Sequence, residues 1–172
     1  MRIELRPNVV SPVPGALCVG TADGQPLAYI DRTPYIGTEP TTHAEIAEPL
    51  ADAADHAATK VFGGEWNGDL SRVAYINRRT VTHDRIMRYG LPPWVLALIG
   101  RAAAHSHPRL LGFVLLSVAG LREVDEGGRD RSPGREEMRR AAMEILDEGI
   151  DILRYAITER GKHPRAGGVT KS

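Results

Sequence analysis

Apolar and polar residues alternate near the start of the chain, which predicts short antiparallel strands. The segment 2–6 (RIELR) alternates as a half-buried strand does, and three prolines in 7–14 impose an extended linker after it. Two apolar runs, 16–21 and 26–31, flank Asp23-Gly24, a dipeptide typical of hairpin turns. The pattern therefore predicts one strand followed by a β-hairpin.

A capping pair that begins at Thr42 predicts the start of the first helix. The preceding segment 33–42 is expected to be a loop. Thr42 and Glu45 have the Thr-x-x-Glu spacing of a capping box, so the helix is expected to begin there. It is expected to end at Phe62, before a Gly-Gly pair. Pro49, one turn into this segment, is expected to kink or restart the helix.

The middle of the chain is expected to hold a further strand and two helices. An Asn-Gly pair at 67–68 indicates a turn, and a strand is predicted after it at 71–77. Thr82 can cap a short helix over 83–89, which a glycine ends. A Pro-Pro pair then opens another helix toward Ala104.

The last third of the chain is dominated by a long predicted helix. Residues 109–121 form a continuous apolar run that is helix or buried strand, because periodicity cannot separate the two. Residues 122–135 are expected to be an exposed loop, and 134–160 a helix. The tail 161–172 is basic and rich in glycine, so it is expected to be flexible.

The predicted helix 134–160 carries a broad apolar stripe. Apolar residues recur three or four positions apart, and small residues widen the stripe. The main positions are Met138, Ala142, Ile145, Leu146, Ile150, Leu153 and Ile157, widened by Ala141, Gly149, Ile152 and Ala156. Such a face needs partners on more than one side, so we expect this helix to pack on its own domain and also to form part of a self-association surface.

These elements together predict an α+β fold. Short N-terminal antiparallel strands with a hairpin precede a mostly helical body and a long C-terminal helix. A chain of 172 residues suits one domain. We expect a single domain over 1–160 and the tail 161–172 outside it.

Composition narrows the class of protein. The formal net charge is zero, so no global field draws the chain to nucleic acid or to an anionic membrane. The single cysteine, Cys18, excludes an internal disulfide framework and fits a reducing compartment.

The start of the chain lacks an apolar signal-peptide core, and charged residues interrupt the apolar segment 94–121 at its centre. We expect a cytoplasmic protein without a membrane partner. The excess of arginine over lysine is typical of actinobacterial proteins and their phages.

Opposite charges are segregated along the chain. Six acids lie in 42–70, where Lys60 is the sole cation, and seven arginines lie in 71–109, where Asp84 is the sole acid. The acids are Glu45, Glu48, Asp52, Asp55, Glu65 and Asp69; the arginines are Arg72, Arg78, Arg79, Arg85, Arg88, Arg101 and Arg109. The two sets can pair within the fold or between copies, or the arginines can bind the phosphates of a nucleic acid. The nucleic-acid alternative would use Arg78, Arg79, Arg85 and Arg88, and the polar run 77–82, which could contact phosphates, lacks interleaved aromatic residues.

Two sets of residues are candidate metal ligands. His105 and His107 flank one serine, and 105-HSHP-108 resembles the core motif of the JAMM/MPN metal-dependent isopeptidases. That resemblance implies a hydrolytic zinc site with a serine and an aspartate at fixed spacing. Here Ser117 comes two residues late, and Gly120 stands at the position of the aspartate. The alternative is that both histidines cap the end of the preceding helix.

A second candidate row lies on the first predicted helix. Glu48, Asp52 and His56 recur every four residues, so they share one helix face. Carboxylates and an imidazole at this spacing can hold a divalent ion, and the alternative is a solvated face.

No complete catalytic set is present, so the leading hypothesis is a non-catalytic interaction or assembly protein without a cofactor. It would act as an oligomer or in a larger complex with a protein partner. The alternatives are a nucleic-acid-binding protein and a metal-dependent hydrolase at His105 and His107.

Overall fold

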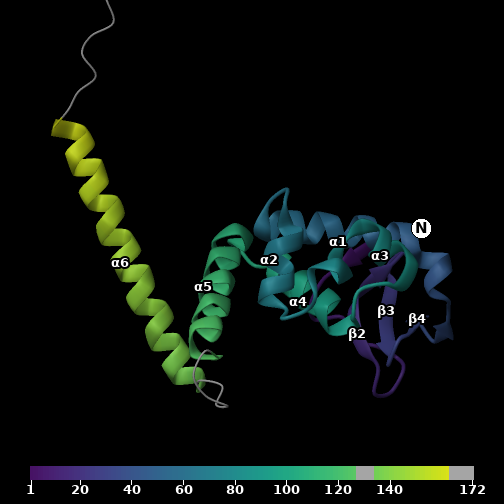
Figure 1. The fold of residues 1–172 in the computed structure, drawn as a ribbon. Coiled ribbons are helices and arrows are strands. Elements are labelled where there is room, and N and C mark those ends of the chain that lie inside the picture. Colours follow the sequence, from purple (N-terminus) through teal and green to yellow (C-terminus); the bar gives the residue numbers. More distant parts are fainter. Residues whose placement is uncertain (127–133, 163–172) are drawn as a thin grey trace, which may run out of the picture. The chain divides into compact units, whose positions relative to one another are not determined.

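The computed structural model describes residues 1–126 and 134–162. An antiparallel sheet comes first and helices follow, so the predicted α+β class is confirmed. Contacts divide the chain into two units, residues 1–119 and 120–172. Figure 1 shows the sheet and the helices packed on it in the first unit.

The sheet has five strands in sequential order, each antiparallel to the next. They are β1 (Ile3–Leu5), β2 (Leu17–Ala22), β3 (Gln25–Ile30), β4 (Thr33–Ile36) and β5 (Glu39–Pro40). The predicted hairpin is confirmed: Asp23 and Gly24 connect β2 and β3, and both have positive φ. Two successive residues with positive φ give the turn the twist that adjacent strands need.

The loop predicted for 33–42 is wrong, because β4 and β5 extend the sheet there. Pro34, Gly37 and Pro40 resemble turn residues in the sequence. In the structure Pro34 lies near the start of its strand, where a missing N–H costs least. Gly37, with a φ of 62°, makes the turn between the two strands.

The first helix, α1 (His43–Phe62), begins and ends as predicted. The Thr42 N–H donates to the side chain of Glu45 at the start of the helix. Gly63, which has a positive φ, directly follows its last residue. Pro49 lies inside α1 and neither ends it nor divides it. Its face toward the core consists of Ile46, Leu50, Ala51, Ala54, Ala57, Ala58, Val61 and Phe62.

The strand predicted for 71–77 is wrong. Residues Trp66–Val73 form the helix α2, and the Asn-Gly pair lies inside it. Trp66 and Leu70 lie four residues apart, and both are buried. The indole Nε1 of Trp66 also donates to Asp55 Oδ1 on α1, at 2.8 Å. This packing against α1 outweighs a local pattern that resembles a strand.

Four further segments follow α2. They are the 3₁₀ helix η1 (Arg78–Val81), α3 (His83–Tyr89), α4 (Pro93–Ala103) and α5 (Pro108–Glu126). The predicted helices 83–89 and 93–104 are confirmed, and 109–121 is helix. Residues 122–126 of the predicted loop continue α5, while 127–133 lie outside the described residues.

The last helix, α6, spans Arg135–Lys162 and confirms the predicted long C-terminal helix. Its last two residues belong to the segment predicted as a tail, and 163–172 lie outside the described part. No helix in the described ranges is long and apolar enough to cross a bilayer.

The core of the first unit forms around α1. This helix contacts α2, α3, α4 and β1, and α4 also contacts β1 and β2. Val19 and Leu27 supply the apolar face of the sheet, and Leu96 and Ile99 that of α4. His43 Nε2 lies 3.1 Å from the carbonyl oxygen of Ile86 and 3.0 Å from that of Met87. The imidazole therefore joins the start of α1 to the end of α3.

Candidate functional site

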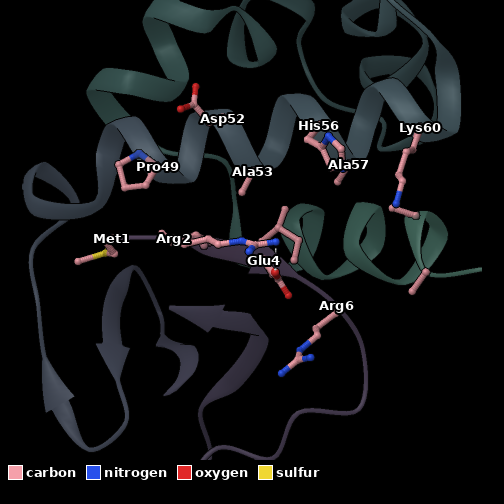
Figure 2. Close-up of a pocket in the computed structure, with 14 residues that line it drawn as sticks. Met1, Arg2, Glu4, Arg6, Pro49, Asp52, Ala53, His56, Ala57 and Lys60 are labelled. Carbon is pink, nitrogen blue, oxygen red and sulfur yellow. Dashed lines mark ion pairs between the residues drawn. The ribbon is translucent and has the colours of Figure 1, made fainter. Parts of the chain in front are cut away.

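A groove of about 630 Å³ lies between β1 and α1 in the first unit. Figure 2 shows residues of β1 along one side and Pro49, Ala53 and Ala57 of α1 along the other. Ala103 and Ala104, at the end of α4, complete the lining. The volume lies in the range of ordinary ligand pockets, and these side chains give the groove an apolar floor.

Charged side chains border the groove. Asp52, His56 and Lys60 recur every four residues on α1 and all contribute to its lining. On the opposite side, Arg2, just before β1, pairs with Glu4 of β1 at 2.7 Å. The predicted row of Glu48, Asp52 and His56 thus contributes two members to the groove. Within the described ranges, no cluster of three or more His, Cys, Asp or Glu side chains could hold a metal ion.

The main chain of β1 has one paired edge and one free edge. Arg6 N–H donates to Val19 O, and Arg2 O accepts from Asp23 N–H. These bonds place residues 2, 4 and 6 in pairs with β2, because hydrogen-bonding positions alternate along an antiparallel strand. The N–H and C=O groups of Ile3 and Leu5 therefore point to the opposite edge. β1 is an edge strand of the sheet, and among the described residues no main-chain hydrogen bond reaches Ile3 or Leu5 from that side.

Four candidate nucleic-acid-binding arginines lie on two elements in contact. Arg78 and Arg79 belong to η1, Arg85 and Arg88 belong to α3, and η1 packs on α3. All four side chains are exposed. Among the described residues, no ion pair joins any of them to an acid of the 42–70 segment.

Two exposed aromatic side chains lie near these arginines in the sequence. They were not among the candidate residues predicted from the sequence. Tyr89 is 59% exposed and Trp94 is 46% exposed, at the end of α3 and the start of α4. The Arg85 guanidinium lies over the Tyr89 ring, 5.3 Å from its centroid. We name Arg78, Arg79, Arg85, Arg88, Tyr89 and Trp94 the arginine–aromatic surface. Burial decides which aromatic residues can stack on a ligand, so the sequence alone does not reveal them.

His105 and His107 lie in the bend between α4 and α5, and both are exposed. Their ring centroids are 6.3 Å apart. The His107 N–H donates to His105 Nδ1 at 3.1 Å, and Ser106 Oγ lies 3.0 Å from His107 Nδ1. His105 therefore binds the backbone just before α5, whereas the capping alternative placed its bond on the last carbonyls of α4. No described acidic, cysteine or further histidine side chain joins the two as a third ligand.

The described part of α6 carries exposed apolar side chains. Met143, Ile145, Leu146 and Ile152 are between 42% and 60% exposed. Ala142 and Gly149, seven residues apart, lie on the same stripe of the helix. In the described region, no atom lies within 4 Å of the position that a Cβ at Gly149 would occupy. A second helix therefore has room to approach at this point.

No known protein family, curated protein or solved structure matches the chain. The groove is the feature that sequence reasoning missed most completely. Its two sides come from residues 1–6 and 49–60, and no local pattern relates those segments. The one available signal is the short side chains at Ala53 and Ala57, which share a face of α1 with Asp52, His56 and Lys60.

Proposed function

We propose that this chain is a non-catalytic interaction protein that self-associates through α6. The observation that carries the proposal is the row of exposed apolar side chains on that helix. A helix of 28 residues is about 42 Å long, and an apolar stripe along it is stable in water when another surface covers it. The small residues Ala142 and Gly149 favour a second helix as that surface, because they allow two helix backbones to approach closely.

The test is sedimentation velocity over a micromolar concentration series. The double variant Ile145→Ser, Ile152→Ser removes two exposed apolar side chains from α6. We expect the parent chain to associate and this variant to associate more weakly by a factor of about 100 or more, because each buried isoleucine contributes about 1.5–3 kcal/mol. The matched control is Glu144→Ser, Asp151→Ser, which changes the preceding residues at the same spacing.

The control should associate as the parent does, since both of its positions are exposed and charged in the parent. A parent chain that stays monomeric across the series would refute the proposal. Equal weakening in the two double variants would also count against it, because the effect would then not depend on the apolar stripe.

A second candidate function is single-stranded nucleic-acid binding at the arginine–aromatic surface. The specific observation in its favour is that the exposed ring of Tyr89 lies under the guanidinium of the exposed Arg85, and that Trp94, five residues further along the chain, is exposed as well. Bases of any sequence stack on aromatic rings, and arginines bind the phosphates. Aromatic side chains exposed beside arginines are what this mode of binding requires.

The test of the second function is fluorescence anisotropy with a labelled oligothymidine at several salt concentrations. We expect affinity to fall with salt, and the Arg85→Gln, Arg88→Gln variant to lower the salt slope by about 1–2. Trp94→Ala should weaken binding without changing that slope, because stacking releases no counterions. Arg32→Gln, at an exposed arginine outside the surface, is the control. Binding that does not respond to salt would exclude this function.

A further inference from the structure

We propose that the groove between β1 and α1 binds an extended polypeptide segment with an acidic side chain, which adds to the sheet as a strand beside β1. This inference does not depend on self-association through α6. Every residue that lines the groove lies within residues 1–104, in the first unit.

The main chain of β1 determines the kind of ligand. Ile3 and Leu5 each direct an N–H donor and a C=O acceptor toward the free edge, as the bonds made by Arg2 and Arg6 require. Donors and acceptors that alternate along a line match the main chain of another extended polypeptide. A flat apolar ligand would leave these groups without partners, and leaving such groups unpaired is costly once water is excluded.

The groove beside this edge has room for an added strand. The side of α1 that faces it carries Pro49, Ala53 and Ala57, whose side chains are short. Ala103 and Ala104 keep the end of α4 equally small. Larger residues at these positions would fill the space of about 630 Å³ along β1. The short side chains of the floor also favour apolar residues on the bound segment.

The charges along the groove indicate an acidic residue on that segment. Arg2 and Glu4 pair with each other, which leaves Asp52 as the remaining acid of the lining and Arg6 and Lys60 as its remaining arginine and lysine side chains. Figure 2 shows Arg6 and Lys60 toward the end of the groove away from Met1. Neither takes part in an ion pair among the described residues. A carboxylate on the bound segment would complement this end of the groove.

The ligand can be sought with random heptapeptides displayed on phage and selected on the intact protein. We expect the selected peptides to share an aspartate or glutamate. A chain with Ala53→Tyr, which fills the groove, should select none of them. Thermal unfolding of this variant checks that it is folded. If the parent chain and the Ala53→Tyr chain select the same peptides, the groove is not their binding site and the proposal is wrong.

A change to one main-chain atom tests strand addition directly. Cys18 is the sole cysteine, so a synthetic 1–17 thioester can be ligated to the Cys18–Ser172 fragment. N-methylation of Leu5 removes its outward N–H and leaves the β1–β2 bonds intact. We expect this change to lower the affinity for a selected peptide by about five- to tenfold, which is the effect of one lost hydrogen bond. N-methylation of Val10, which is exposed and outside β1, is the control. Equal affinities for both ligated proteins would overturn strand addition.

The acidic side chain is tested on both partners. Lys60→Glu should lower the affinity for the selected peptide at least tenfold. Arg32→Glu makes the same charge change outside the groove and should leave that affinity unchanged. Replacing the acid of the peptide by its amide should lower affinity for the parent and have less effect on Lys60→Glu. Peptides without an acidic residue, or affinities unaffected by Lys60→Glu, would contradict the charge assignment.

A parent chain that selects no peptide but dimerises, and loses the dimer on N-methylation of Leu5, would overturn the peptide as occupant of the groove. The occupant would then be a second copy of the chain.

Discussion

At the scale of single residues, Glu45 shows how one side chain sets a helix boundary. Its carboxylate accepts the Thr42 N–H at 2.8 Å and the hydroxyls of Thr41 and Thr42 at 2.7 and 2.9 Å. These bonds favour the charged form, the Thr42 backbone bond most strongly, and they hold the pKa of Glu45 below its usual value of 4.5. The same contact therefore begins α1 and makes stability depend on pH.

We expect the Glu45→Gln variant to be less stable than the parent chain at neutral pH, with a difference that shrinks in acid. Because the pKa of Glu45 is lower in the folded chain, its contribution is complete above pH 4.5 and is lost as pH falls through the folded value. Urea unfolding from pH 7 to below pH 4 measures the difference. The control variant Glu48→Gln changes a glutamate of the same helix that lies outside the capping box, and it should not reproduce the Glu45 difference. A Glu45 difference that stays constant with pH would contradict the assignment.

At the scale of elements, the approach of α5 to α1 depends on one glycine. A methyl group at Gly112 would overlap the carbonyl oxygen of Val61 on α1. Gly112 is also buried, inside a helix whose sequence offers no reason to place a glycine there. Glycine is unfavourable in a helix interior, so its position here is explained by the close contact.

We expect Gly112→Ala to lower the free energy of unfolding by about 2 kcal/mol or more, even though alanine favours a helix by about 1 kcal/mol. Urea denaturation measures the change. Gly64→Ala is the matched control, because among the described residues no atom lies within 4 Å of its Cβ position. That control should change stability by about 0.5 kcal/mol at most. A stabilising effect of Gly112→Ala would mean that the two helices do not meet closely.

At the scale of the whole molecule, the first unit holds the described cluster of buried core residues. The buried apolar residues of the described chain run from Ile3 to Ala119. The described side chains of α6 instead include large apolar groups that are exposed. A single domain over 1–160, which the sequence led us to expect, stays a prediction that truncation can test.

We expect a chain truncated after Glu126 to unfold cooperatively, with a melting temperature within about 4 °C of the parent, because the core cluster is retained. Differential scanning calorimetry measures this. The truncated chain should also have lost self-association, which sedimentation can record alongside. If it instead melts without a cooperative transition, α6 belongs to the same folding unit as the sheet, as a single domain over 1–160 requires.

The elements that could be predicted from the residues alone are those whose signals are local. Thr42 and Glu45 begin α1, Gly63 ends it, and Asp23-Gly24 turns the first hairpin. Each signal acts within about four residues, through backbone conformation or a short hydrogen bond, so it can be read without knowledge of the fold. The long apolar pattern of α6 is local in the same sense.

The remaining features depend on contacts between segments that are distant in sequence. Trp66 and Leu70 make a helix where the sequence resembled a strand, because α1 offers them a surface on which to be buried. Pro34 joins a strand because its neighbours Thr33 and Tyr35 pair with β3 and its own carbonyl oxygen accepts the Thr41 N–H. The groove exists because residues 1–6 and 49–60, more than 40 positions apart in sequence, lie side by side with short side chains between them. Contacts between segments so far apart in sequence depend on the fold of the whole chain, and no short stretch of sequence encodes them.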